Sequence, residues 1–377
     1  MNKIDILGFK IESFDSESFV EDVVSFKPNS LILGYDTDKV FVKHKPGNIN
    51  LRKELFKFIR LKEPRLNYFL YPVVFIIDSC RLFLFFLVLF LKFKVKVVVS
   101  ENTYAVFLIG ILRRLKFIPQ LIYVSGDWLA GHNTKRGIWS FLGNEVVFPL
   151  FDYCACKLSD KTVEFTELIK NARRVYWGRQ IARKEIVYSP RLKLMATDDS
   201  RKRTGIAFIG NIRPDSGFEL IFGLMKELRD SFDARLSLIG PDSENLRRLL
   251  KSSRFEGLAG FIDFHGFLDR DEFNNALMDC FCGVNLITSR TSYSSMTVPA
   301  KICDYLQYLL PPLVTPNLGY YAHIISENQL GLVVEPLKDE ITKGLVSLYK
   351  EQHIYRKIII DYIKANSRSL VKDYLEA

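Results

Sequence analysis

Several features that mark common protein classes are missing from this chain of 377 residues. The six cysteines contain no C-x-x-C pair, and a C-x-C pair on a strand points to opposite faces and suits one metal ion poorly. No zinc-finger spacing or glycine- and aromatic-rich RNA-binding signature occurs, so nucleic acid is not an expected partner. No signal-peptide pattern opens the chain, and we therefore expect reduced thiols and a cytoplasmic location.

The sequence also lacks an uninterrupted apolar run long enough to cross a membrane. Residues 69–91 are very apolar, but Asp78 and Arg81 interrupt them, and the clean run 82–91 has only ten residues. A membrane-spanning helix needs about 20. We expect a long helix that packs in the core or lies in a bilayer interface, with residues 92–96 near the headgroups. A true span is the alternative.

What is present is a globular composition with a one-sided charge. The chain is 48% hydrophobic and 25% charged, which argues against disorder. The whole net charge of +10 lies in residues 1–190, because acidic and basic residues balance in 191–377. This distribution predicts an anionic partner for the first half, and an anionic membrane surface is our choice. A solvated basic face without a partner is the alternative.

Strand and helix patterns alternate along both halves, which predicts βαβ units and parallel sheets. The polar stretch 189–203 separates the two series and is typical of a linker. We predict an α/β fold with Rossmann-like parallel-sheet domains at 1–190 and 191–345, followed by a helical segment, 346–377. The predicted strands are 31–34, 95–100, 121–125, 162–165, 186–188, 205–209, 234–239, 262–265, 283–287 and 313–315. The predicted helices are 69–92, 103–115, 145–158, 218–229, 244–252, 271–278, the helix opened by Pro299, and 354–375.

The helix opened by Pro299 carries the strongest signal of a site. Proline suits the first turn of a helix, where its missing N–H costs nothing. Lys301, Asp304 and Tyr308 then share one face. A lysine near a helix N-terminus can meet phosphate, and the Asp304 carboxylate can accept hydrogen bonds from two ribose hydroxyls. A surface helix with an ion pair between Lys301 and Asp304 is the alternative.

Polar residues also follow three other predicted strands of the second half. Ligands of open α/β sheets bind outside the carboxyl ends of the strands, so these loops are candidate sites. Their glycines let a phosphate approach the backbone, while arginine and hydroxyl groups can donate to it. Plain turns are the alternative, because no Walker lysine is present. The residues are Gly210, Asn211, Arg213, Ser289, Arg290, Asn317 and Gly319.

One loop of the first half ends the predicted strand 121–125. It contains Asp127 and His132, which could act as a general base or orient a sugar hydroxyl. We nominate both as catalytic residues. An aspartate that caps the next helix is the alternative for Asp127.

The second half resembles the nucleotide-binding domain of a GT-B glycosyltransferase, closest to the retaining family 4 (group 1). The resemblance spans about 205–340 and rests on ordered segments. They are Ile209–Gly217, Leu238–Pro241, Ile262–Phe267 and Pro299–Thr315, with Leu330–Pro336 as the strand that follows. The resemblance implies a two-domain GT-B fold in which the first domain binds the acceptor. It also implies that the C-terminal helix crosses back to pack on the first domain.

The resemblance assigns roles to four residues of the second domain. Asp304 stands where the family usually has the glutamate that holds the donor ribose. Lys301 is the basic residue of the P-x-K version of this helix. Gly266 and Phe267 would line the nucleobase.

The sequence departs from the family at the diphosphate. Asn211 and Ser216 stand where arginine and lysine are usual, and Arg213 or Arg290 would have to substitute. The earlier glutamate of the family's E-x7-E pattern falls at Met296. These departures put the catalytic details in doubt.

The resemblance implies a hexosyltransferase, retaining as in the family, that uses a nucleotide-diphosphate-sugar donor. The acceptor would be a lipid-linked glycan or a polysaccharide in surface glycan biosynthesis, on the inner face of the cell membrane. Cationic groups and helix ends would stabilise the leaving diphosphate, so no metal or other cofactor is expected. A nucleotide-sugar epimerase of the same fold and a catalytically inactive, membrane-associated assembly partner are the alternatives.

Overall fold

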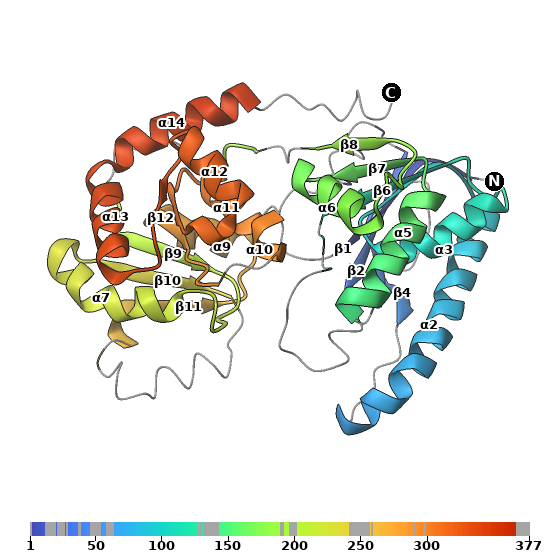
Figure 1. The fold of residues 1–377 in the computed structure, drawn as a ribbon, viewed down its shortest axis with the longest axis horizontal. Helices are drawn as coiled ribbons and strands as arrows, with labels where there is room; N and C mark the ends of the chain where they lie inside the picture. Colours follow the sequence, from blue (N-terminus) through green and yellow to red (C-terminus); the bar gives the residue numbers. More distant parts are fainter. Residues whose placement is uncertain are drawn as a thin grey trace. The chain divides into compact units, whose positions relative to one another are not determined.

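The computed structural model divides the chain into two units, Met1–Pro190 and Arg191–Arg368. The residues it describes are 2–11, 20, 27, 29–36, 39–45, 54–57, 64–126, 128, 130, 143–188, 192–195, 202–240, 257, 259–289, 292–296 and 299–366. The division falls within the polar stretch 189–203. Each unit has its own sheet and its own helices (Figure 1), and each is therefore described by itself.

The first unit is built on an eight-stranded sheet of order β4-β3-β2-β1-β5-β6-β7-β8. From β2 to β8 all neighbouring strands are parallel, as the alternating pattern predicts, whereas β3 pairs antiparallel with β2 and β4. The strands are β1 (Asn2–Ile11), β2 (Ser30–Asp36), β3 (Lys39–His44), β4 (Glu54–Lys57), β5 (Phe93–Ser100), β6 (Gln120–Ser125), β7 (Lys161–Glu164) and β8 (Glu185–Val187). The helices are α2 (Pro64–Lys92), α3 (Thr103–Arg114), η1 (Gly143–Val147), α5 (Phe148–Leu158) and α6 (Glu167–Trp177).

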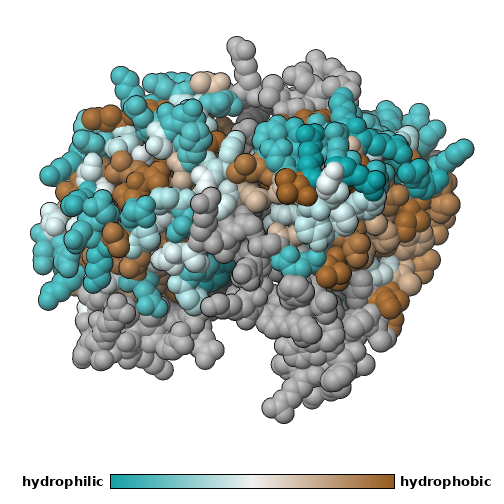
Figure 2. All heavy atoms as spheres, in the orientation of Figure 1, coloured by the Kyte–Doolittle hydropathy of each residue, from teal (hydrophilic) through white to brown (hydrophobic). Residues whose placement is uncertain are grey.

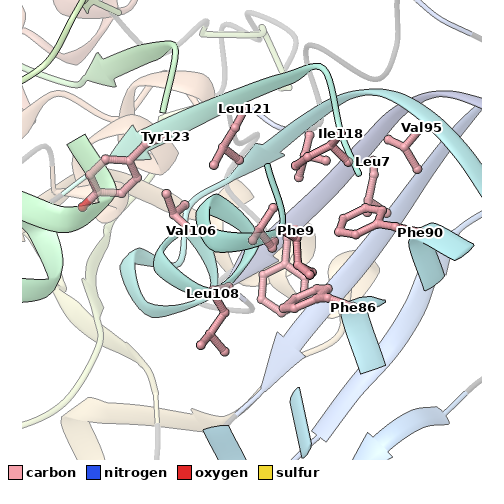
Figure 3. Close-up of a cluster of buried hydrophobic side chains, with 14 of the residues drawn as sticks. Leu7, Phe9, Phe86, Phe90, Val95, Val106, Leu108, Ile118, Leu121 and Tyr123 are labelled. Carbon is pink, nitrogen blue, oxygen red and sulfur yellow. The ribbon is translucent and has the colours of Figure 1, made fainter. Parts of the chain in front are cut away.

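Helices α2 and α3 cover one face of this sheet and form a large apolar core with it (Figure 3). Phe86 and Phe90 of α2 pack with Phe9 of β1, and the rings of Phe9 and Phe86 meet edge to face with centroids 5.5 Å apart. The Asn102 side chain begins α3 by accepting a hydrogen bond from the Ala105 N–H at 2.9 Å. Full burial of an apolar side chain such as that of Phe86 contributes about 1.5–3 kcal/mol to stability.

Helix α2 also exposes apolar side chains on its outer face. Ile77, Leu84, Val88 and Leu91 are each 44–60% exposed, and their spacing places them along one stripe. Figure 2 shows hydrophobic residues over the part of the first unit where α2 runs. Among the residues that the structure describes, no helix combines the length and the apolar character that a membrane crossing requires.

The second unit has a fully parallel six-stranded sheet of order β11-β10-β9-β12-β13-β14. Renumbered from its first strand this is 3-2-1-4-5-6, the Rossmann order. The strands are β9 (Gly205–Ile209), β10 (Arg235–Ile239), β11 (Ile262–Gly266), β12 (Cys280–Asn285), β13 (Pro312–Val314) and β14 (Leu332–Val333). The helical elements are α7 (Phe218–Phe232), η3 (Ala259–Phe261), α9 (Arg270–Met278), α10 (Ser292–Met296), α11 (Ala300–Gln307), η4 (Pro316–Leu318), α12 (Tyr320–Glu327), α13 (Lys338–Lys350) and α14 (Gln352–Asn366).

One of the predicted strands in this unit needs corrected bounds, and one prediction lies outside the described residues. The strand predicted at 283–287 runs from Cys280 to Asn285; residues 280–287 are all buried, so no alternation marks its ends. The helix predicted at 244–252 lies outside the described residues.

The C-terminal segment packs within the second unit as far as it is described. Helix α14 ends at Asn366, and its buried Ile359 and Ile363 belong to the same apolar cluster as Ile302 of α11. The cluster on the other sheet face contains Ile341 of α13. A crossing to the first domain would have to use residues 367–377, which lie outside the described residues, so it stays a prediction.

Candidate functional site

The candidate site lies at the carboxyl ends of β9 and β12. These strands are neighbours at the centre of the second sheet, and the chain continues from them toward opposite edges. Such a switch point leaves a crevice in which ligands of α/β sheets bind. The loops that follow the two strands approach each other, since the Thr288 N–H donates to the Asp215 carbonyl oxygen at 3.0 Å.

Three glycines end neighbouring strands at this edge. Gly210, Gly240 and Gly266 have φ angles of +113°, +155° and +70°, a region that favours glycine. The Gly210 N–H donates to the Ile239 carbonyl at 2.8 Å, and the Gly240 N–H donates to the Gly266 carbonyl at 2.9 Å. Three successive strands therefore end in residues that have no side chain of their own, and backbone hydrogen bonds hold these ends together.

Lys301 lies directly beside the first of these glycines. A Cβ atom on Gly210 would be 3.3 Å from the Lys301 Nζ, so the lysine occupies the space that the glycine leaves. Lys301 is half-buried, and its Nζ lies 5.8 Å from the centre of the Phe208 ring. The Lys301 pKa is lowered to about 8, mainly by burial and to a lesser extent by the Arg213 charge, while Asp215 opposes the shift. A cation held in this environment would gain from the charge of a diphosphate.

The loop after β9 contains the positions at which the sequence departs from the group 1 glycosyltransferases that it resembles. Ser216 is buried, and its hydroxyl donates to the Arg213 carbonyl at 2.7 Å and accepts from the Arg213 N–H at 3.2 Å. The Arg213 guanidinium is exposed and pairs with Asp215 at 3.3 Å, and Asn211 is exposed. Ser216 thus closes a turn, and Arg213 shares its charge with a carboxylate.

Asp304 is buried, 6% exposed, in the middle of α11. Residues 302–310 are all buried, which excludes the alternative of a solvent-exposed surface helix. Pro299 precedes the first helical residue, where it serves as the N-cap, and does not occupy the first turn. The ribose contact of Asp304 stays a prediction.

The loop that follows β12 and the turn that follows β13 are joined by hydrogen bonds. The Asn317 amide donates to the Ile287 carbonyl at 2.9 Å, and the Ser294 hydroxyl donates to the Asn317 carbonyl at 3.2 Å. Gly319 has φ +59°, and a Cβ there would lie 2.5 Å from the Ser295 carbonyl oxygen. Asn317 and Gly319 therefore shape this side of the crevice. Ser289 is exposed in the same loop, while Arg290 lies outside the described residues.

The third strand end presents an aromatic surface. Phe267 directly follows Gly266 and is 73% exposed. An exposed ring beside a glycine turn offers a flat apolar face to a nucleobase. The role in base binding stays a prediction.

One important residue was missed by the sequence reasoning. Tyr305 is fully buried, and its hydroxyl lies between β9 and β12. The available signal was Gly283, a glycine inside an apolar strand, which indicates a close approach. A Cβ on Gly283 would lie 2.2 Å from the Tyr305 ring.

The predicted catalytic residues of the first unit, Asp127 and His132, lie outside the described residues. The end of β6 beside them is described. The buried Ser125 hydroxyl accepts a hydrogen bond from Arg173 at 2.7 Å. The Trp128 ring lies 5.8 Å from the Arg173 guanidinium.

Arg173 is the centre of a fully buried charge network at this edge. It donates to both oxygens of Asp152 at 2.6 and 3.0 Å and also to Glu164. The Tyr123 hydroxyl donates to Asp152 at 2.9 Å. The Glu164 pKa is raised to about 7, mainly by burial and also by the Glu185 and Asp152 carboxylates, while Arg173 opposes the shift. The network joins α5, α6, β6 and β7.

A pocket of about 380 Å³ lies elsewhere, at the amino ends of the strands in the second unit. Its lining includes Gly205, Arg235 and Cys280, which begin β9, β10 and β12. This is the edge opposite to the strand-end loops. We place the candidate site at the carboxyl edge, because the glycine row and Lys301 supply a phosphate-binding chemistry there.

Comparison with known proteins gives a family match for the second unit. Residues 203–351 match the family model described as Glycosyl transferases group 1. No curated protein matches the chain.

Solved structures match over nearly the whole chain. HepE from Anabaena in complex with UDP has a TM-score of 0.64 at 11% identity, with 99% of this chain and 98% of that chain covered. WaaG, a glycosyltransferase involved in lipopolysaccharide biosynthesis, has a TM-score of 0.60 at 13% identity, with 98% of each chain covered. The chain has the GT-B glycosyltransferase fold. A UDP-forming trehalose-phosphate synthase from Burkholderia xenovorans also shares the GT-B fold, with a TM-score of 0.62 at 11% identity over 100% of this chain and 99% of that chain. The resemblance to group 1 transferases is thus confirmed.

Proposed function

We propose that the protein is a glycosyltransferase that binds a nucleotide-diphosphate sugar at the carboxyl edge of its second sheet. The observation that carries the proposal is Lys301, a half-buried cation packed against Gly210 at the switch point. Relatives of the same fold support it, since HepE binds UDP and UDP-glucose. The diphosphate would lie between the Gly210 loop and Lys301, the ribose at Asp304 and the base at Phe267.

The leaving diphosphate would be stabilised by the protein itself. Lys301 supplies a positive charge in a poorly solvated position, and preorganised cations of this kind stabilise developing negative charge. We propose that no metal is needed, that the transferred sugar is a hexose, and that its anomeric configuration is retained.

We propose a lipid-linked or polysaccharide acceptor and a peripheral position on the cytoplasmic face of the membrane. The basic excess of residues 1–190 and the exposed apolar stripe of α2 support an anionic membrane surface as the partner. WaaG, which acts in lipopolysaccharide biosynthesis, supports a surface-glycan acceptor.

Calorimetry with UDP-, ADP-, GDP- and dTDP-sugars, with and without EDTA, tests donor binding. Asp304→Ala is expected to weaken binding of the accepted donor at least 10-fold, because loss of a charge-assisted hydrogen bond removes about 1.5–3 kcal/mol. Asp339→Ala, an exposed carboxylate in the first turn of α13, is the matched control. Unchanged affinity in Asp304→Ala would refute the ribose assignment.

One observation favours the inactive assembly partner as a second candidate. Ser216 replaces the usual diphosphate lysine and is buried in its own turn. If no sugar nucleotide binds, this candidate is supported. Release of an isomerised sugar nucleotide without an acceptor would instead identify an epimerase.

A further inference from the structure

The Tyr305 hydroxyl occupies the point where the two central strands of the second sheet separate. β9 and β12 pair only as far as Ala207 and Gly283. Beyond that pair, the Ile209 N–H donates to the Tyr305 hydroxyl at 3.1 Å. The hydroxyl lies within donating distance of the Val284 carbonyl, at 3.1 Å, and of the Ala207 carbonyl, at 3.3 Å. The Tyr305 hydroxyl therefore takes the place of the backbone hydrogen bonds between β9 and β12 where the two strands separate.

The position of this phenol is fixed from several sides. Its ring lies against Gly283, where even one added carbon would come within 2.2 Å. Tyr305 follows Lys301 by one helical turn of α11, so one helix carries both the cation and the group that joins the strands. Ile209, which the hydroxyl holds, directly precedes Gly210 of the candidate site.

We propose that Tyr305 is a positioning residue for the donor site. Its hydroxyl fixes the separation of β9 and β12 and thereby the place of the Gly210 loop relative to Lys301. The inference rests on the proposed binding of the donor at this edge. Without the hydroxyl, the buried Ile209 N–H loses its acceptor, and the end of β9 is no longer tied to β12.

Tyr305→Phe tests this inference because it removes one oxygen and keeps the ring. Calorimetry with UDP, ADP, GDP and dTDP should show at least 10-fold weaker binding of the nucleotide that the wild type prefers. Tyr308→Phe is the matched control: it is also a buried tyrosine, at the end of the same helix, and its hydroxyl donates to Asn274 of α9. It should lower the melting temperature similarly and leave the affinity unchanged. Equal affinities of both variants and the wild type overturn the inference.

Hydrogen exchange without any nucleotide provides a second readout. Peptides that cover residues 205–217 should exchange faster in Tyr305→Phe than in Tyr308→Phe, because only the first variant frees the Ile209 amide. Unchanged exchange there overturns the inference even if affinity falls. If the wild type binds no nucleotide, the proposed function fails, while the exchange experiment still decides whether the hydroxyl holds the loop.

Discussion

Replacement of Glu164 by glutamine should make the first unit more stable, with a gain that grows as the pH rises from about 4.5 to 7. The Glu164 carboxylate is fully buried at the end of β7. One of its oxygens accepts a hydrogen bond from Arg173, and the other, Oε2, has no hydrogen-bond partner in the structure as described. Arg173 also forms an ion pair with Asp152, so two carboxylates share one guanidinium. Glutamine keeps the acceptor for Arg173 and carries no charge.

The magnitude follows from the shift of the Glu164 pKa, from 4.5 to about 7. An acid whose pKa is raised in the folded state destabilises that state once it ionises. Its contribution is therefore fully favourable below pH 4.5 and is lost as the pH rises to 7. A shift of about 2.5 units corresponds to about 3 kcal/mol. Glu164→Gln should thus resemble the wild type near pH 4.5 and exceed its free energy of unfolding by about 3 kcal/mol at pH 8.

Urea unfolding followed by tryptophan fluorescence can measure this effect in the first unit alone. All three tryptophans of the chain, Trp128, Trp139 and Trp177, precede residue 190. Glu167→Gln, on the exposed surface of α6, is the control and should stay within about 0.5 kcal/mol of the wild type at every pH. A difference between Glu164→Gln and the wild type that does not change with pH would refute the reasoning.

Two further predictions concern the donor site and the membrane. Donor affinity of the wild type should fall as the pH rises through about 8, because Lys301 loses its charge there. The Lys301→Arg variant keeps its charge, so its donor affinity, measured by calorimetry, should stay constant from pH 7 to 9.5. A flat wild-type profile contradicts this. Leu84→Asp combined with Val88→Asp should reduce sedimentation with phosphatidylglycerol vesicles several-fold, because both side chains lie on the exposed stripe of α2. Val175→Asp, an exposed position on α6, should have no effect, and equal loss in both variants would exclude the stripe as the contact.

The sequence predicts the alternating α/β architecture well because parallel strands and amphipathic helices have different periods. It does not predict β1, β3 and β4, in which charged residues interrupt the apolar pattern. The Pro299 helix was found because its cation and carboxylate are close in sequence.

Other parts of the structure depend on contacts between distant segments. Asp152, Glu164 and Arg173 resemble ordinary surface charges in the sequence, and only the packing of α5, β7 and α6 brings them together. Tyr305 likewise resembles any helical aromatic residue until Gly283 is placed beside it. Such groups cannot be predicted from local patterns, because their burial is decided by tertiary structure.

The apolar clusters described above have a consequence for the order in which the chain folds during synthesis. In the described residues, each cluster draws on one unit only, and those of the first unit end at Tyr188. The first unit can therefore complete its core while the ribosome is still making the second. The second unit needs Ile359 and Ile363 of α14 to complete its core. The second unit therefore cannot complete its core until almost the whole chain has been synthesised. A premature stop before α14 should yield a folded first unit joined to an incomplete, aggregation-prone second unit.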